Sequence, residues 1–214
     1  MTLNPVLSLS NMRDIHTLCQ HYLQIIYHDI GALSHENPNK INPATETQGE
    51  ILYPSITKLL SVITLTADDV FIDLGSGTGK ITAQVFLMSP VKEAWGIEIV
   101  PELHQYAVRA SERIQREFLG FFMHGRKLNL LQGSFFDIPF RTATVALINA
   151  TCFSQMILHR LSKIINETPS IHTVFSLRPL TALTRLVFKK TIRIECSWDS
   201  ALCYVYGENS SNTR

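Results

Sequence analysis

Two acidic residues, Asp73 and Glu98, lie at the ends of two short apolar segments, and a glycine-rich loop directly follows the first. Glycines let the backbone pass close to a ligand, and the start of a following helix offers free N–H groups. In open α/β sheets this strand-to-helix turn is where ligands bind. The pattern therefore predicts a ligand site that includes Asp73, Gly75, Ser76, Gly77 and Gly79.

The spacing of the loop excludes two common phosphate-binding motifs. A dinucleotide fingerprint that starts at Gly75 needs glycine at position 80, which is Lys80. A P-loop needs serine or threonine after its lysine, and Ile81 stands there. Because a carboxylate at the strand tip repels phosphate, the loop suits a ligand with a cationic amino-acid group.

Glu98 indicates which ligand that is. It ends the apolar run Trp95–Ile99, 25 residues after Asp73. A carboxylate at the tip of the second strand accepts hydrogen bonds from both ribose hydroxyls of an adenosine. Together the two acids suit S-adenosylmethionine, which carries an ammonium, a sulfonium and a free ribose diol; the alternative is a glycine turn and a surface glutamate. We expect this cofactor and no metal.

Two further strand ends belong to the predicted site. Ser134 stands where an acid usually meets the adenine amino group, with Asp137 or a backbone carbonyl as its replacement. Phe135 is expected to stack on the adenine, or else to be a core residue. Asn149 follows the run Val145–Ile148 without the N-P-P-Y or D-P-P-Y pattern of enzymes that methylate base amines. It is expected to orient an amine or the methionine part of the donor, or else to cap the next helix.

The elements that must position these residues alternate along the chain, which predicts an α/β fold with a mostly parallel sheet. A C-terminal hairpin, joined at Trp198–Ser200, adds an antiparallel edge. Helices are expected at 11–28, 50–63, 80–88, 101–118 and 153–166, and strands at 70–74, 94–99, 127–131, 144–149, 172–177, 191–197 and 201–207. We divide the chain into an N-terminal helical extension with a lid loop (1–66), a core (67–208) and a tail (209–214).

Composition supports one sizeable core and excludes a disordered regulator, because 45% of the 214 residues are hydrophobic. No run reaches the roughly 18 apolar residues of a membrane span, and the start lacks the basic region of a signal peptide. The four cysteines form no CxxC pair and are expected to be reduced core residues. The net charge is +1, with an acidic N-terminal and a basic C-terminal third. We expect a soluble intracellular protein.

Several motifs together resemble the Dot-one family (disruptor of telomeric silencing) of histone lysine methyltransferases that lack a SET domain. The resemblance begins at the run QGEILYPSITKLL and continues through FIDLGSGTGK, GIEI, QREF, GSFF and LINATCF to SW ahead of CYVY. Their order and spacing hold from about residue 20 to residue 207. The resemblance thus covers nearly the whole chain.

The resemblance implies a Rossmann-like, seven-stranded class I methyltransferase sheet that binds S-adenosylmethionine. It implies a protein substrate with an acceptor lysine, in a histone or nucleosome, and a cytoplasmic location, or a nuclear one if the substrate is chromatin. The implied donor-binding residues are Gln48, Glu50, Asp73, Gly75, Ser76, Gly77, Gly79, Lys80, Glu98, Ser134, Phe135 and Asn149. The implied catalytic residues, which line the lysine channel, are Asn149, Phe153, Trp198, Tyr204 and Tyr206.

The chain departs from the family pattern at three positions. Gln48 replaces a tyrosine, Lys80 a glutamine and Ser134 an aspartate. The sequence also ends without the basic tail with which the family holds nucleosomal DNA. A weak C-terminal basic patch is expected instead, from Arg178, Arg185, Lys189, Lys190 and Arg193.

The expected reaction is in-line methyl transfer to a neutral lysine amine. Because a free lysine has a pKa of about 10.4, the channel must favour the uncharged amine by removing water. Two alternatives stay open at this point: a class I methyltransferase that acts on a non-histone protein or a small molecule, and a donor-binding module with weakened or no catalysis.

Overall fold

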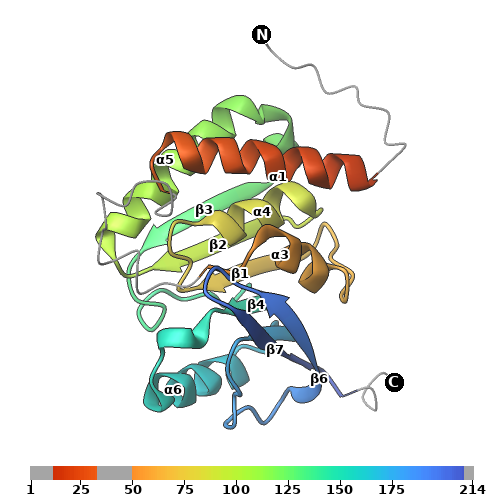
Figure 1. Cartoon of the computed structure of the whole chain (residues 1–214). Coiled ribbons are helices and arrows are strands. Elements are labelled where there is room, and N and C mark those ends of the chain that lie inside the picture. The colour runs from red at the N-terminus through yellow and green to blue at the C-terminus, as the bar shows by residue number, and fades with distance from the viewer. Residues whose placement is uncertain (1–11, 33–49, 210–214) are drawn as a thin grey trace.

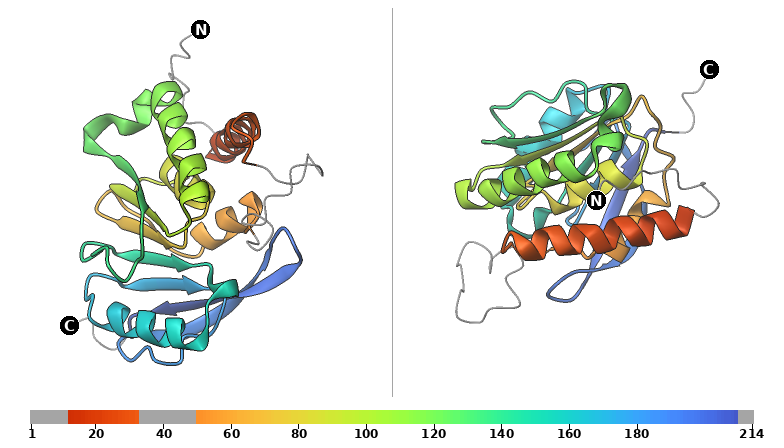
Figure 2. Two further views of the ribbon diagram at one scale, coloured as in Figure 1. Left: turned by 90° about the vertical axis from the view of Figure 1, so that its left-hand side faces the viewer. Right: turned by 90° about the horizontal axis from the view of Figure 1, so that it is seen from above.

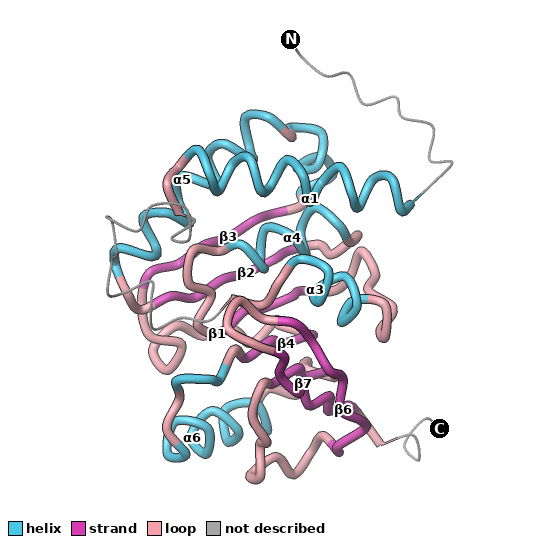
Figure 3. Tube along the Cα trace, in the orientation of Figure 1, coloured by secondary structure: helices cyan, strands magenta, loops and turns pink. Residues whose placement is uncertain are grey.

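The structure of the chain, a computed structural model, describes residues 12–32 and 50–209. Seven strands form one sheet in the order β3-β2-β1-β4-β5-β7-β6 (Figure 1; Figure 3). The strands are β1 (Val70–Leu74), β2 (Glu93–Glu98), β3 (Lys127–Gln132), β4 (Val145–Ile148), β5 (Thr173–Ser176), β6 (Val187–Glu195) and β7 (Ser200–Gly207). The expected Rossmann-like fold is confirmed.

Strand direction brings the predicted site residues to one edge of the sheet. Strands β1 to β5 are parallel, and β7 lies antiparallel between β5 and β6. In the register of β1 and β2, Asp73 lies opposite Gly96. Asp73 and Glu98 therefore lie near the carboxyl ends of two adjacent inner strands of the sheet.

Helices cover the two faces of the sheet unequally. They are α1 (Met12–Asp29), α3 (Tyr53–Leu60), α4 (Lys80–Met88), α5 (Pro101–Glu117) and α6 (Gln155–Asn166), with 3-10 helices η2 (Leu119–Gly125) and η3 (Ala150–Cys152). Helix α4 packs on β1 and β2, α1 lies over α4 and α5, and α3 packs on α4 and β6. Helix α6 covers the opposite face (Figure 2).

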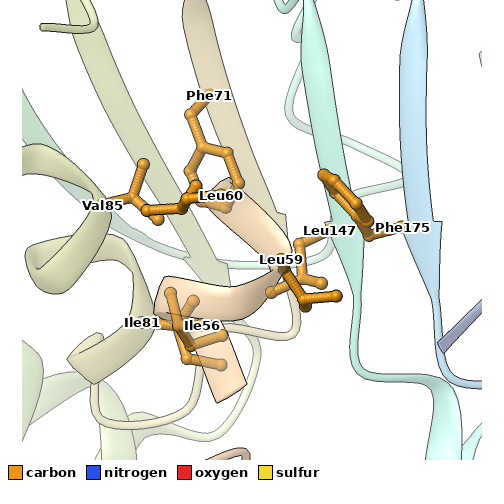
Figure 4. Close-up of a pocket in the computed structure, with 8 residues that line it drawn as sticks. All are labelled: Ile56, Leu59, Leu60, Phe71, Ile81, Val85, Leu147 and Phe175. Atoms are coloured by element: carbon orange, nitrogen blue, oxygen red, sulfur yellow. The ribbon is translucent and has the colours of Figure 1, made fainter. Parts of the chain in front are cut away.

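Alternation along the strands produces two hydrophobic cores. Phe71 of β1 packs with Leu147 of β4 on the face of α1, α3 and α4, whereas Ile72 packs on the face of α6. A small cavity lies beneath α3 (Figure 4), and all its lining side chains are apolar: Ile56, Leu59, Leu60, Phe71, Ile81, Val85, Leu147 and Phe175. It is a gap in the core, without a polar group to orient a ligand.

Several expected element boundaries are wrong. The helix expected at 50–63 is shorter because Ile51 pairs with Cys196 before α3 begins. The helix expected from residue 153 begins at Gln155, since Ser154 is its N-cap and accepts a hydrogen bond from the Ile157 N–H (3.3 Å). The expected helix at 11–28 is confirmed as α1, and its predicted cap at position 11 lies outside the described residues.

The C-terminal hairpin is longer than expected, and one cysteine is not in the core. Strand β6 begins at Val187, four residues before the predicted start. The sequence pattern did not indicate these four residues, because Val187–Lys190 are all exposed and show no alternation.

Strands β3 and β4 follow each other without a regular helix. Cys152 is exposed, whereas the other three cysteines are buried. Within the described ranges, no helix is long and apolar enough to cross a membrane.

Candidate functional site

The glycine loop between β1 and α4 adopts a backbone conformation that favours glycine. Gly75, Gly77 and Gly79 have φ values of +89°, +56° and +76°, in the left-handed region where a Cβ is strained. The loop is anchored on β2, since the N–H groups of Gly75 and Ser76 both donate to the Ile97 carbonyl (2.9 and 3.0 Å). The loop thereby stays close to the end of β2, where Glu98 lies.

Glu98 is only 3% exposed, and both of its oxygens accept backbone hydrogen bonds. Oε2 accepts from the Gly77 N–H (2.7 Å) and Oε1 from the Val100 N–H (2.8 Å). These bonds orient the carboxylate between the glycine loop and the start of α5. Each oxygen has a further lone pair, so the oriented carboxylate can also accept hydrogen bonds from a diol.

Asp73 is the most deeply buried acid of the site, at 1% exposure. Its Oδ2 accepts a long hydrogen bond from Thr82 Oγ1 (3.3 Å), and its Oδ1 has no hydrogen-bond partner among the described residues. Burial raises the pKa of Asp73 to about 7, and the nearby Glu98 charge adds to this rise. A buried acceptor without a partner fits the ammonium of an amino-acid ligand.

A second charged cluster lies at the start of α4. Lys80 Nζ forms an ion pair with Glu50 Oε2 (2.7 Å) and lies 4.7 Å from the centre of the Tyr53 ring. The Tyr53 hydroxyl is buried and has no partner in the described part of the chain. Burial and the Glu50 charge raise the pKa of Tyr53. Gln48, the third predicted residue here, lies outside the described residues.

Two tyrosines near this cluster were missed by sequence reasoning. Tyr53 begins α3, and Tyr27 of α1 donates a hydrogen bond to the Thr78 carbonyl of the glycine loop (3.2 Å). Both occupy apolar positions of amphipathic helices, which is also where core residues lie. The one available signal was that Tyr53 lies three residues after Glu50.

Phe135, expected at the adenine, and Phe153, expected in the lysine channel, form an aromatic wall after the ends of two strands. The rings of Phe135 and Phe153 have centroids 5.5 Å apart. The Phe153 ring also lies over the glycine loop, 3.1 Å from the position of a Cβ built on Gly75. Ser134 is half-buried, and its Oγ accepts a hydrogen bond from the Phe136 N–H (3.1 Å). Phe153 therefore contacts the glycine loop, and Phe135 packs beside Phe153.

Asn149 lies directly after β4, on the same edge of the sheet as this wall. It is half-buried, and its Oδ1 accepts a hydrogen bond from Thr151 Oγ1 (3.4 Å). Asn149 is the N-cap residue of η3, and its side chain makes no capping hydrogen bond there. Arg178 donates a hydrogen bond to the Phe153 carbonyl and so holds the segment after Asn149 against the end of β5.

The three C-terminal aromatics occupy different environments. Trp198 is 46% exposed in the connection between β6 and β7. Tyr204 is half-buried opposite Ser176, the last residue of β5. Tyr206 lies two residues further from that edge, packs in the core on the α6 face and accepts a hydrogen bond from the Leu180 N–H (2.9 Å). Tyr206 is thus placed as a core residue, away from the glycine loop.

The predicted basic patch is smaller than its five residues suggest. Arg185 donates hydrogen bonds to the carbonyls of three interior residues, Ile165, Thr168 and Ile171. The guanidinium of Arg178 likewise binds a carbonyl. Of the five, only Lys189, Lys190 and Arg193 are exposed, all three on β6.

Comparison with known proteins gives consistent matches. The model of a family described as histone methylation protein DOT1 matches residues 32–196. A Drosophila melanogaster protein, histone-lysine N-methyltransferase, H3 lysine-79 specific, is 30% identical over 155 residues, which cover 69% of this chain and 8% of that protein. A Gibberella zeae protein of the same name is 28% identical over 183 residues, or 80% and 37%. The chain thus spans much less than two thirds of the length of either relative.

Solved structures share the fold at low identity. An RNA methyltransferase from Salinibacter ruber, in complex with S-adenosyl-L-homocysteine, has a TM-score of 0.51 at 20% identity and covers 73% of this chain and 92% of its own. The B. subtilis m1A22 tRNA methyltransferase TrmK has a TM-score of 0.55 at 14% identity, with 72% and 65% covered. Both likenesses concern the architecture alone.

Proposed function

Because the chain belongs to the family of histone methylation protein DOT1, we propose that it transfers a methyl group from S-adenosylmethionine to a protein lysine. The observation that carries the proposal is the pair of buried carboxylates, Asp73 and Glu98, at the ends of adjacent strands around the glycine loop. Its relatives in Drosophila melanogaster and Gibberella zeae are named for histone H3 lysine-79. Histone H3 is therefore the substrate to test first.

The residues at this edge fit each part of the methyl donor. Glu98, oriented by two backbone N–H groups, would accept hydrogen bonds from the ribose hydroxyls. Asp73, with its partnerless Oδ1, would accept one from the ammonium. Phe135 would provide a face for the adenine. When bound, S-adenosylmethionine supplies an electrophilic methyl group on its sulfonium.

The acceptor lysine must reach the site as a neutral amine. In water its pKa of about 10.4 keeps it protonated near pH 7. Phe153 and its aromatic neighbour Phe135 make the loop an apolar surface, and removal of water from a lysine favours its uncharged form. Asn149 would align the amine, so catalysis would consist mainly of positioning the two reacting atoms.

The exposed group of Lys189, Lys190 and Arg193 is proposed as the contact for a negatively charged part of the substrate, such as nucleosomal DNA. With chromatin as substrate the protein would act in the nucleus. The division of the chain into an extension (1–66), a core (67–208) and a tail (209–214) stays a prediction. The role of Trp198 and Tyr204 as walls of the lysine channel also stays a prediction.

Two substitutions separate donor binding from transfer. Glu98→Gln removes the charge from the ribose contact, so the affinity for S-adenosylhomocysteine in calorimetric titration should fall roughly tenfold or more. Asn149→Ala should change this affinity by less than about twofold and lower the rate of radiolabelled methyl transfer roughly tenfold or more. Glu117→Gln, on the outer face of α5, serves as the matched control, and unchanged affinity in Glu98→Gln would refute the ribose contact.

A further inference from the structure

A nine-tenths-buried lysine directly follows the glycine loop and is paired with a much more exposed acid. The Lys80 side chain is 11% exposed and that of Glu50 is 34% exposed, with 2.7 Å between Nζ and Oε2. Lys80 is the first residue of α4, which packs on β1 and β2. The ammonium is therefore held by the core, whereas its carboxylate partner lies at the border with solvent.

Besides Asp73 Oδ1, a second buried polar atom without a partner in the described part of the chain lies near Lys80, the Tyr53 hydroxyl. The Lys80 ammonium lies over the Tyr53 ring at 4.7 Å, and the buried Tyr53 hydroxyl has no partner among the residues that the structure describes. Asp73 lies at the same end of α4, since Thr82, two residues after Lys80, donates a hydrogen bond to Asp73 Oδ2 (3.3 Å). The start of α4 therefore holds the Lys80 ammonium and contacts the Asp73 carboxylate.

The charges of this cluster match the amino-acid end of the donor. The ammonium of the donor can pair with Asp73, and the α-carboxylate of the donor needs a cation and a hydrogen-bond donor. Lys80 and the Tyr53 hydroxyl provide these two groups beside the loop. In the structure, the Glu50 carboxylate pairs with Lys80, while the Tyr53 hydroxyl has no partner among the described residues.

We propose that Glu50 is a stand-in for the α-carboxylate of the donor, and that donor binding replaces Glu50 by the ligand carboxylate on Lys80. This inference rests on the proposed function, because it assigns one further contact to the same donor. It names Lys80 and Tyr53 as the residues that select a ligand with a free α-carboxylate.

Burial decides which partner leaves. Glu50 is one-third exposed, so its carboxylate regains water when the pair breaks. Lys80 cannot follow, because an unpaired charge in the interior carries a large desolvation penalty. The pair therefore opens readily only for a ligand that brings its own carboxylate, and Glu50 competes with that ligand.

The test compares S-adenosylmethionine with decarboxylated S-adenosylmethionine by calorimetric titration of the full chain. Since a partly exposed ion pair contributes up to about 1 kcal/mol, Glu50→Gln should bind S-adenosylmethionine about two- to fivefold tighter than the wild type. Lys80→Gln should bind it roughly tenfold or more weakly, because a hydrogen-bonded charge is lost. For the decarboxylated ligand both variants should match the wild type within about twofold.

The double variant and a control complete the design. In the Lys80→Gln background, Glu50→Gln should have no further effect, since the cation for which the two carboxylates compete is gone. Glu117→Gln breaks another ion pair, Arg113 Nε to Glu117 Oε1 at 2.8 Å, and should leave binding of both ligands unchanged. Thermal unfolding of each variant checks that it is folded.

Two results separate this inference from the proposed function. If the wild type binds S-adenosylmethionine but Glu50→Gln binds it equally or more weakly, the exchange is refuted and the proposed donor site stands. Equal wild-type affinity for both ligands would refute the exchange in the same way. If the folded wild type binds neither ligand, the proposed donor site fails and this inference fails with it.

Discussion

At the residue scale, the two acids that the spacing singled out differ in their hydrogen bonds. Glu98 accepts two short hydrogen bonds from backbone N–H groups, which orient its carboxylate. Asp73 receives one long hydrogen bond, and burial raises its pKa to about 7 from the ordinary value of 3.8. The folded protein therefore retains the Asp73 proton between about pH 4 and pH 7, where the unfolded chain has lost it.

The raised pKa of Asp73 has opposite effects on the pH dependence of ligand binding and of stability. The ligand ammonium requires the ionised form of Asp73, so binding is expected to weaken as the pH falls below 7. The Asp73 contribution to the free energy of unfolding has the opposite trend, because the native state binds more protons than the unfolded state. That contribution decreases from about pH 4 to pH 7 and is constant above.

The first prediction concerns the pH dependence of donor affinity. Between pH 7.0 and 5.5 the wild-type affinity for S-adenosylmethionine should fall by up to about tenfold per pH unit. The ligand ammonium stays charged in this range, since α-amino groups have pKa values of about 8. Asp73→Asn, which does not titrate, should lose this dependence in the same calorimetric series. A wild-type affinity that stays constant from pH 7.0 to 5.5 would mean that Asp73 does not bind the ammonium.

Spacing alone could identify Asp73 and Glu98, because each ends an apolar run that must be a buried strand. It could not identify Tyr53 or Tyr27. A tyrosine at an apolar helix position has the same pattern as a core residue, and only tertiary packing shows where its hydroxyl points. The partnerless oxygen of Asp73 likewise results from how α4 and β1 pack.

At the element scale, the region before α3 is held by the distant C-terminal hairpin. Ser55 Oγ donates to the Glu195 carbonyl (3.0 Å) and accepts from the Glu195 N–H (2.7 Å). The Glu50 N–H donates to Ser197 Oγ, and the Ser197 N–H donates to the Glu50 carbonyl. Glu50, the partner of Lys80, is therefore positioned by the tip of the hairpin, next to Trp198.

The second prediction tests this attachment. Ser55→Ala removes both hydrogen bonds at a buried position and leaves Glu195 backbone groups without this partner, which should lower the free energy of unfolding by about 1–3 kcal/mol. Ser61→Ala, which removes one exposed hydrogen bond to the Lys58 carbonyl (2.8 Å), should cost less than about 0.5 kcal/mol. Urea denaturation measures both. Equal losses in the two variants would show that the Ser55 bonds do not hold the hairpin.

Local patterns predicted the elements that are locally determined. Helix α4 has the predicted bounds 80–88, and β1 has the predicted bounds 70–74. The start of α3 was placed too early because the bridge between Ile51 and Cys196 joins residues far apart in sequence. The first residues of β6 were missed because an exposed edge segment has no inward-facing side chains to create alternation.

At the scale of the whole molecule, a mostly parallel, seven-stranded sheet with an antiparallel C-terminal edge could be predicted from the alternation of elements together with the family motifs. The distribution of helices could not: α1, α3, α4 and α5 gather on one face, and α6 on the other (Figure 2). Charge counts were also an incomplete guide. Arg178 and Arg185 raise the positive charge of the C-terminal third, yet their guanidinium groups bind carbonyls within the fold.

A methyltransferase that acts on a folded protein needs a surface that contacts this substrate, in addition to the donor site. The exposed group on β6 and the exposed Trp198 lie on the hairpin that extends from the body of the molecule (Figure 2). A free histone and a nucleosome present the same lysines with different surroundings. Comparison of the two therefore distinguishes recognition of a peptide segment from recognition of an assembled surface.

The most direct test of the proposal is radiolabelled methyl transfer from S-adenosylmethionine to reconstituted nucleosomes and to free core histones, with the modified residue located by mass spectrometry. We expect label on a histone H3 lysine with the wild-type chain, and a loss of roughly tenfold or more with Glu98→Gln at limiting donor concentration. Wild-type protein that binds the donor but labels no histone, free or assembled, would contradict it.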